Sequence, residues 1–232
     1  MIEELLPDSV VAVDTHGEDG LRDAPLYPEE EALMARAVPK RRREFSAVRA
    51  CARRAMEKLG VAPQPIVPGE SGAPRWPAGL VGSMTHCDGY CAAALARATD
   101  LASLGIDAEP DGPLPPDVGS YVFLPTESAR LRRLAEEHPA VHWDRLLFSA
   151  KESVYKAWFP LTGKWLDFAE ADIEVYADAD RDLVPGGRGH GGLRARLLVP
   201  GPWVGERRVQ WFEGRWTVRD GVVATTVVVP HS

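Results

Sequence analysis

The chain has 232 residues, of which 45% are hydrophobic and 26% are charged, and its formal net charge is −7. This composition predicts a soluble globular protein with a full core, built as one large domain or two small ones. The negative charge argues against a general nucleic-acid-binding protein. No apolar stretch is long enough to span a bilayer, and the N-terminus does not read as a signal peptide. Three cysteines make a disulfide framework unexpected, so we predict a cytoplasmic protein that binds neither nucleic acid nor membrane.

The first half of the chain mixes predicted helices and strands. Residues 10–15 read as a short strand, and Pro28 and Pro39 each open a predicted helix, because proline favours the first helical position. The second of these helices, residues 40–60, repeats apolar side chains at helical spacing and ends at Gly60. After a loop rich in proline and glycine, strands are predicted at residues 80–86, 90–97 and 101–109, although the small side chains of 90–97 also suit a helix.

The second half begins with a proline-rich loop and two predicted helices, at residues 126–137 and 143–159. The rest is predicted as strands at residues 172–177, 193–199, 207–212, 215–219 and 222–229, with turns at glycines such as Gly214. This order of elements predicts an α+β fold in two halves, residues 1–109 and 110–232.

One face of the predicted helix 143–159 carries an unusual carboxylate. Glu152 lies at helical spacing from the aromatic residues Phe148, Tyr155 and Phe159. A carboxylate among aromatic side chains is costly unless a metal ion, a lysine or a reacting proton stabilises it. The alternative is an ordinary salt bridge to Lys156, four residues further along the helix.

Two more acids are predicted to share one face of a strand. In the segment GIDAEP (105–110), Asp107 and Glu109 point to the same side, while Ile106 and Ala108 face the core. Together with Glu152 they form a suitable ligand set for one hard cation such as Mg²⁺, with Mn²⁺ as the alternative ion. A solvated strand edge explains the two strand acids equally well.

Basic residues gather at the start of the helix 40–60. The run KRRR (40–43) lies at the helix N-terminus, where anions are favoured, and Arg49 follows it on the same helix. This pattern predicts a phosphate clamp, although a charged face exposed to solvent is an equal alternative. The segment GSMTHC (82–87) ends a strand with Thr85 and His86, and this imidazole can donate to a phosphate or bind a metal.

Taken together, these segments resemble the Sfp-type 4′-phosphopantetheinyl transferases, including the EntD-like and actinobacterial members. The resemblance runs from about residue 27 to the end of the chain. Its most specific part is the pairing of GIDAEP (105–110) with the lysine–glutamate–(three residues)–lysine pattern of residues 151–156. It implies two similar, pseudo-symmetric α/β halves with coenzyme A in the cleft between them. It also implies transfer of the 4′-phosphopantetheine arm of coenzyme A to a serine of an acyl or peptidyl carrier protein, which releases adenosine 3′,5′-bisphosphate.

The resemblance further implies a role for each candidate residue. Mg²⁺ would be held by Asp107, Glu109 and Glu152, and the catalytic residues would be Asp107, Glu152 and Lys156. Glu152, or a water it orients, would take the serine proton, and Lys156 would stabilise the departing phosphate. Coenzyme A would also contact Lys151 at its pyrophosphate, Arg41, Arg49, Thr85 and His86 at its nucleotide end, and Phe148, Tyr155, Trp165 and Leu166 along its pantetheine arm.

The adenine end departs from some relatives, which carry a lysine where this chain has the segment Pro68-Gly69-Glu70-Ser71. The adenine contacts are therefore assigned to backbone groups of residues 69–73, Ser71 and Gly72 among them.

The expected partners are coenzyme A and a carrier protein of fatty acid, polyketide or nonribosomal peptide synthesis, and a monomer is expected by analogy with the family. Because carriers are usually acidic, as this chain is, a local docking patch is predicted near residues 111–135, with Arg130, Arg132 and Arg133. Two alternatives stay open: a non-catalytic module that binds coenzyme A or a carrier protein, and a Mg²⁺-dependent nucleotide phosphodiesterase.

Overall fold

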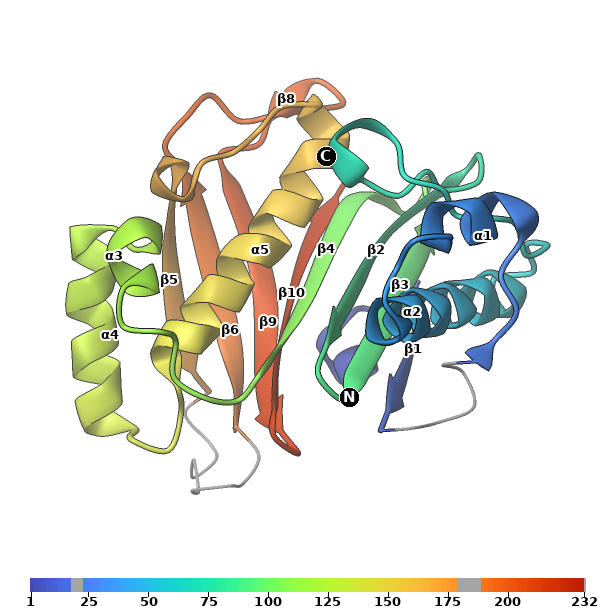
Figure 1. The fold of residues 1–232 in the computed structure, drawn as a ribbon. Helices are drawn as coiled ribbons and strands as arrows, with labels where there is room; N and C mark the ends of the chain where they lie inside the picture. Colours follow the sequence, from blue (N-terminus) through green and yellow to red (C-terminus); the bar gives the residue numbers. More distant parts are fainter. Residues whose placement is uncertain (18–22, 179–188, 232) are drawn as a thin grey trace.

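The computed structural model describes residues 1–17, 23–178 and 189–231, and it has the mixed α and β composition that the sequence predicts (Figure 1). The first half contains η1 (Ile2–Leu5), β1 (Val10–His16), α1 (Pro28–Met34), α2 (Pro39–Lys58), η3 (Glu70–Gly72), β2 (Leu80–Cys87) and β3 (Tyr90–Arg97). Next come β4 (Leu101–Pro110), α3 (Val118–Val122), α4 (Pro125–Glu137), α5 (Trp143–Thr162), η4 (Phe168–Glu170) and β5 (Ala171–Ala177). The chain continues with β6 (Gly189–Leu197), β7 (Trp203–Val204), β8 (Arg207–Arg208), β9 (Trp211–Arg219) and β10 (Val222–Pro230).

Two antiparallel sheets carry the fold. One has the strand order β1-β3-β2, and the other has the order β4-β10-β9-β6-β5. A helix of 20 residues packs on each sheet, α2 on the first and α5 on the second. The two halves therefore repeat one arrangement, an antiparallel sheet with a long helix across it, and both helices lie on the viewer's side of the strands in Figure 1.

The boundary between the sheets lies before β4 and not after it. β4 pairs with β10 along its whole length, with Pro110 opposite Val222 and Leu101 opposite Pro230. Hydrogen bonding to β10, the last strand of the chain, assigns β4 to the second sheet. The predicted division between residues 109 and 110 falls within β4 and would leave nearly all of this strand with the first half. The chain passes from the first sheet to the second in the turn of residues 98–100, between β3 and β4.

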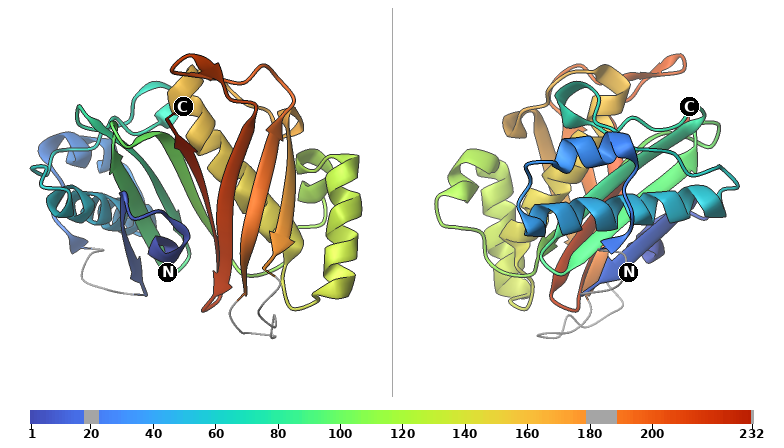
Figure 2. Two further views of the ribbon diagram at one scale, coloured as in Figure 1. Left: turned by 180° about the vertical axis from the view of Figure 1, so that it is seen from behind. Right: turned by 45° about the vertical axis from the view of Figure 1, so that its right-hand side comes forward.

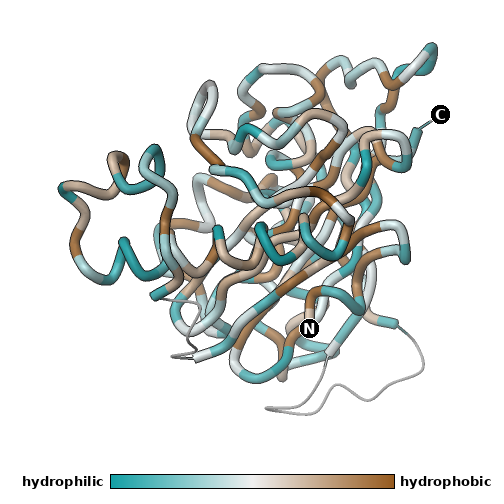
Figure 3. The backbone as a smooth tube through the Cα atoms, turned by 90° about the vertical axis from the view of Figure 1, so that its right-hand side faces the viewer, coloured by the Kyte–Doolittle hydropathy of each residue, from teal (hydrophilic) through white to brown (hydrophobic). Residues whose placement is uncertain are grey.

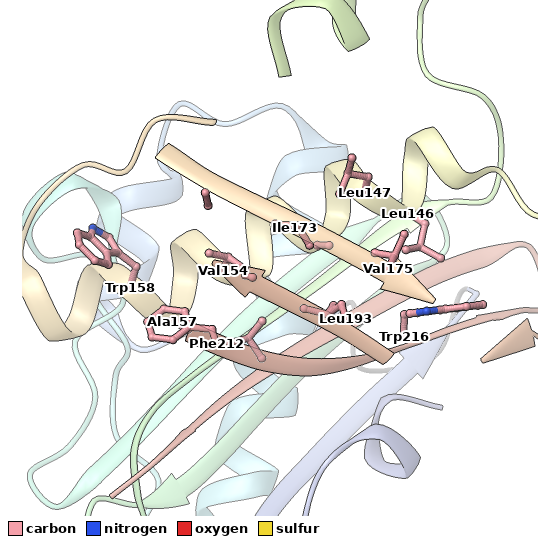
Figure 4. Close-up of a cluster of buried hydrophobic side chains, with 14 of the residues drawn as sticks. Leu146, Leu147, Val154, Ala157, Trp158, Ile173, Val175, Leu193, Phe212 and Trp216 are labelled. Atoms are coloured by element: carbon pink, nitrogen blue, oxygen red, sulfur yellow. The ribbon is translucent and has the colours of Figure 1, made fainter. Parts of the chain in front are cut away.

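Hydrophobic side chains form separate cores on the two faces of the five-stranded sheet. Between α5 and the sheet, Leu146, Val154 and Ala157 pack against Ile173, Leu193, Phe212 and Trp216 (Figure 4). On the opposite face, Ile106 and Ala108 of β4 join a core shared with β1, β3 and η1. The left view of Figure 2 looks onto this face of the sheet, with α5 behind the strands. Segments coloured as hydrophobic run through the middle of the molecule in Figure 3, and hydrophilic ones predominate in the outer loops.

Two glycines allow close approaches that the sequence did not reveal. A Cβ on Gly105 would lie 2.0 Å from the Ser153 carbonyl oxygen, so its absence lets α5 pack directly on β4. A Cβ on Gly214 would lie 1.8 Å from the Thr226 carbonyl oxygen of β10. Gly214 therefore marks close strand packing within β9 and not the predicted turn, and the predicted strand 207–212 divides between β8 and the start of β9.

Candidate active site

Asp107 lies at the centre of the candidate site, on the face of β4 that meets α5. It is 5% exposed, and both of its carboxylate oxygens accept hydrogen bonds. Oδ1 accepts from Lys156 Nζ at 2.7 Å and from Thr85 Oγ1 at 3.2 Å, and Oδ2 accepts from Ser149 Oγ at 2.8 Å. The alternative of a solvated strand edge is therefore wrong for Asp107.

Glu109 and Glu152 both interact electrostatically with Asp107. Burial, followed by the negative charge of Asp107, raises the pKa of each of these glutamates above its ordinary value. Glu109 Oε2 accepts a hydrogen bond from Arg145 Nη1 at 3.0 Å. The Glu152 carboxylate makes no hydrogen bond to any residue that the structure describes, and Lys156 pairs with Asp107 in place of the predicted alternative, Glu152.

The three acids do not form a ready-made metal cluster. Across residues 1–17, 23–178 and 189–231, no group of three or more His, Cys, Asp or Glu side chains is arranged to hold a metal ion. The donor chemistry nevertheless fits Mg²⁺, which usually binds one or two carboxylates and takes its other ligands from water and substrate phosphates. Burial is the main reason for the raised pKa of Glu109 and Glu152, and the negative charge of Asp107 adds to it. A divalent cation bound among these acids would neutralise that charge.

A pocket opens beside Glu152 on the aromatic side of α5. It encloses about 410 Å³, counting the open space at its mouth, and its lining includes Tyr155, Trp165 and Leu166. The rings of Tyr155 and Trp165 lie 4.9 Å apart between centroids. Of the three aromatic neighbours predicted for Glu152, Tyr155 lines this pocket, and Trp165 and Leu166 are two of the residues predicted along the pantetheine arm.

Phe168 and Asp167 also line this pocket, and sequence reasoning missed both. The Phe168 ring lies 6.2 Å from that of Phe148, the fourth predicted contact of the pantetheine arm. The short helix η4 brings Phe168 to this wall, and helical spacing along α5 carries no signal for it.

Lys151, predicted at the pyrophosphate, lines the same pocket, but its ammonium is buried and bound to protein acceptors. Its side chain is 3% exposed, and its Nζ lies 2.9 Å from Glu127 Oε1. The same ammonium donates to the carbonyl oxygens of Phe168 at 2.7 Å and Ala171 at 2.9 Å. These three acceptors use all three N–H groups of the ammonium, so none is left for a phosphate.

The predicted nucleotide-binding residues Arg41 and His86 come together. Arg41 Nη1 is hydrogen-bonded to His86 Nε2, which joins the first turn of α2 to the end of β2. Arg49, two turns further along α2, is buried: its Nε donates to the Ile66 carbonyl oxygen at 3.0 Å, and burial lowers its pKa to about 10. The terminal nitrogens of Arg49 make no hydrogen bond with the described residues.

Thr85, predicted at the nucleotide end of coenzyme A, lies beside Asp107 in the structure. Its hydroxyl donates to Asp107 Oδ1, and it accepts from the Ala108 amide at 3.1 Å. The hydroxyl is buried between β2 and β4, and its hydrogen bond to Oδ1 helps to orient the Asp107 carboxylate.

The segment expected at the adenine is an exposed turn. Ser71 and Gly72 both have positive φ, and the Gly69 amide donates to the Ala73 carbonyl oxygen at 2.6 Å. A contact between this turn and adenine stays a prediction.

The predicted carrier-docking arginines differ in their surroundings. Arg130 forms an ion pair with Asp172 and donates to the Ile173 carbonyl oxygen at 3.0 Å, so it ties α4 to β5. Arg132 and Arg133 are exposed. Within the described part of the chain, neither of these two side chains forms an ion pair or a hydrogen bond, whereas Arg130 forms both.

Comparisons with known proteins agree with this arrangement. Residues 29–96 match the family model described as the 4′-phosphopantetheinyl transferase N-terminal domain, and residues 103–186 match the 4′-phosphopantetheinyl transferase superfamily. The two matches fall on either side of the turn before β4.

Three curated relatives cover most of the chain. It is 55% identical to the 4′-phosphopantetheinyl transferase Svp of Streptomyces mobaraensis, over 99% of this chain and 89% of the relative. It is 45% identical to Npt of Nocardia iowensis, over 98% of this chain and 99% of the relative. It is 46% identical to PptT of Mycobacterium tuberculosis, over 87% of this chain and 85% of the relative. Both are named as 4′-phosphopantetheinyl transferases too. The chain belongs to the 4′-phosphopantetheinyl transferase family and is an enzyme of this class.

Among the described residues, no helix combines the length and the apolar character needed to cross a bilayer.

Proposed function

We propose that this enzyme transfers the 4′-phosphopantetheine arm of coenzyme A to a serine hydroxyl of an acyl or peptidyl carrier protein and releases adenosine 3′,5′-bisphosphate. The single observation that carries the proposal is the position of Asp107, which is buried, paired with Lys156 at 2.7 Å and electrostatically coupled to Glu152. Phosphoryl transfer depends mainly on alignment and on neutralising charge, and such a cluster of acids and a lysine suits both needs.

Asp107, Glu109 and Glu152 are the proposed ligands of Mg²⁺, with Mn²⁺ as the alternative ion. A cation bound there would neutralise charge on the pyrophosphate oxygens of coenzyme A. Glu109 accepts a hydrogen bond from Arg145 Nη1 at 3.0 Å, and Asp107 accepts hydrogen bonds on both oxygens. The Glu152 carboxylate makes none with the described residues, so it could bind a cation without giving up a partner.

Glu152 is the proposed base for the serine proton, acting directly or through a water molecule. Its raised pKa makes it a stronger proton acceptor than an exposed glutamate once it is ionised. Lys156 would stabilise the departing phosphate. The nucleotide phosphates would bind Arg41, Arg49 and His86, and the pantetheine arm would follow Phe148, Tyr155, Trp165 and Leu166.

The remaining proposals concern partners and location. We propose a cytoplasmic monomer that binds no nucleic acid and no membrane. Its carrier would come from fatty acid, polyketide or nonribosomal peptide synthesis and would dock near Arg132 and Arg133, both of which are exposed.

One assay tests the proposed reaction. The protein is incubated with an apo carrier protein, coenzyme A and Mg²⁺, and the carrier is weighed by mass spectrometry. We expect the carrier to gain the mass of one phosphopantetheine. An unchanged carrier with cleaved coenzyme A would instead identify a nucleotide phosphodiesterase. An unchanged carrier with coenzyme A bound but intact would identify a non-catalytic module. Either of these results would overturn the proposal.

The variant Arg41→Ala is expected to weaken coenzyme A binding by about 10-fold to 100-fold. A hydrogen bond to a charged group contributes about 1.5–3 kcal/mol, and about 1.4 kcal/mol corresponds to a factor of ten. Arg43→Ala is the matched control, because Arg43 is also exposed on the first turns of α2 but no contact of it with His86 is seen. Calorimetric titration with coenzyme A measures both, and equal affinities would remove Arg41 from the nucleotide site.

A further inference from the structure

Three buried hydroxyl groups form a continuous chain behind Asp107. Ser149 Oγ lies 2.8 Å from Asp107 Oδ2 and 2.9 Å from Thr225 Oγ1. Ser153 Oγ lies 2.7 Å from the same Thr225 Oγ1 and 3.1 Å from the Thr225 carbonyl oxygen. All three residues are fully buried, two on α5 and one on β10.

The fold brings these hydroxyls together from distant parts of the sequence. Thr225 is opposite Asp107 in the register of β10 and β4, so the two side chains lie on the same face of the sheet. Ser149 and Ser153 are one helical turn apart and share a face of α5. Gly105 lets this helix approach the sheet closely enough for the hydroxyls to meet.

The count of donors fixes the direction of the chain. An ionised carboxylate only accepts, so the single hydroxyl proton of Ser149 goes to Asp107. The contact between Ser149 and Thr225 then requires Thr225 to donate, and the single proton of Ser153 is shared between the carbonyl and the hydroxyl oxygen of Thr225. Hydrogen bonds aligned in one direction polarise and strengthen one another.

Packing alone does not explain a threonine at this position. Its neighbours on the same face of β10, Val223 and Val227, are fully buried valines in the core beneath α5. A valine at position 225 would have almost the same shape and would need no hydrogen-bond partner. The threonine hydroxyl is therefore explained by its contacts with Ser149 and Ser153.

We propose that Thr225 is a positioning residue for Asp107. Through Ser149 it holds Oδ2 against the core, which leaves Oδ1 directed at Lys156, on the side proposed for the cation and the pyrophosphate. Without the Thr225 hydroxyl, Ser149 loses its donor and the orientation of Asp107 is less strictly defined. This inference rests on the proposed role of Asp107 in the transfer reaction.

The test compares Thr225→Val with the matched control Thr226→Val. Thr226 is equally buried, but it lies on the opposite face of β10, where its hydroxyl donates to the Leu5 carbonyl oxygen at 3.3 Å. Partners that orient a metal ligand typically change metal affinity or activity by about 10-fold to 100-fold. We therefore expect Thr225→Val to weaken the binding of Mn²⁺ alone, measured by electron paramagnetic resonance, and to lower kcat by about tenfold, with the KM for coenzyme A unchanged. Thr225→Ser, which keeps the hydroxyl, should recover both.

Several outcomes would overturn the inference. Mn²⁺ binding and kcat in Thr225→Val that equal those of Thr226→Val would show that its hydroxyl does not act through Asp107. If Thr225→Val does not fold, Ser149→Ala removes the direct contact to Asp107, and wild-type Mn²⁺ binding in this variant would equally refute the proposal. The proposed function would be refuted by a wild-type protein that binds Mn²⁺ but modifies no carrier. In that case, loss of Mn²⁺ binding in Thr225→Val but not in Thr226→Val would still support the positioning role.

Discussion

Replacing Glu152 by glutamine is expected to lower kcat by about 100-fold to 10,000-fold, because it removes the proposed base for the serine proton. The variant keeps the shape of the side chain, and Glu152 makes no hydrogen bond to a described residue that the change would break. The affinity for coenzyme A should therefore change far less than kcat. Mass spectrometry of the carrier over time measures the first quantity, and calorimetry measures the second.

Glu152→Gln should not lower the free energy of unfolding, and the direction of the pKa shift of Glu152 gives the reason. Burial raises the pKa of Glu152, so its ionised form is less favourable in the folded state than in the unfolded chain. This cost builds up as the pH rises from the ordinary pKa to the raised pKa, and it is fully present above the raised pKa. At neutral pH the glutamine variant should be as stable as the wild type or slightly more stable in urea unfolding.

Glu174→Gln is the control for this experiment, because Glu174 is exposed on β5. It should leave both the rate and the stability unchanged. In the wild type, kcat should rise with pH as Glu152 ionises, and the residual rate of Glu152→Gln should lack this rise. A wild-type kcat in Glu152→Gln would contradict the assignment of the base.

Replacing Lys151 by methionine is expected to lower the free energy of unfolding by about 3–5 kcal/mol, because removal of one partner leaves a buried charge uncompensated. The charge left behind is Glu127, which is fully buried and also accepts hydrogen bonds from the amides of Leu124 and Ile173, each at 2.8 Å. Urea unfolding monitored by fluorescence measures the loss.

Lys164→Met is the matched control, because Lys164 is exposed just beyond the end of α5 and should lose little stability. A pyrophosphate contact by Lys151 would give the opposite pattern, with wild-type stability and a higher KM for coenzyme A. The double variant Lys151→Met with Glu127→Gln should regain part of the lost stability, since glutamine is neutral and keeps an acceptor for the Ile173 amide.

Local patterns predicted the surroundings of the acids correctly where one element decides them. The alternation along β4 placed Ile106 and Ala108 in a core and Asp107 on the opposite face, because side chains alternate across any strand. Helical spacing placed Glu152 beside Tyr155, and both line the pocket on α5. These relations depend only on the repeat of the local structure.

Contacts between elements could not be predicted in this way. Lys151 and Glu152 are adjacent in sequence and both line the pocket, but the Lys151 ammonium pairs with Glu127 on α4, whereas the Glu152 carboxylate makes no hydrogen bond with the described residues. No local pattern indicates that Arg145 pairs with Glu109 or that Thr225, on the last strand, joins Asp107 through Ser149.

The sequence by itself determined the α+β class, most of the elements, the family resemblance and the acids that face away from the core. Only the tertiary structure decided which sheet β4 joins and which lysine meets Asp107. It also decided which hydroxyls orient that carboxylate. The reason is physical: the periodicity of a helix or strand sets the direction of each side chain relative to its own element, whereas hydrogen-bond partners depend on how elements distant in sequence pack, here on the close approach of α5 to β4 at Gly105.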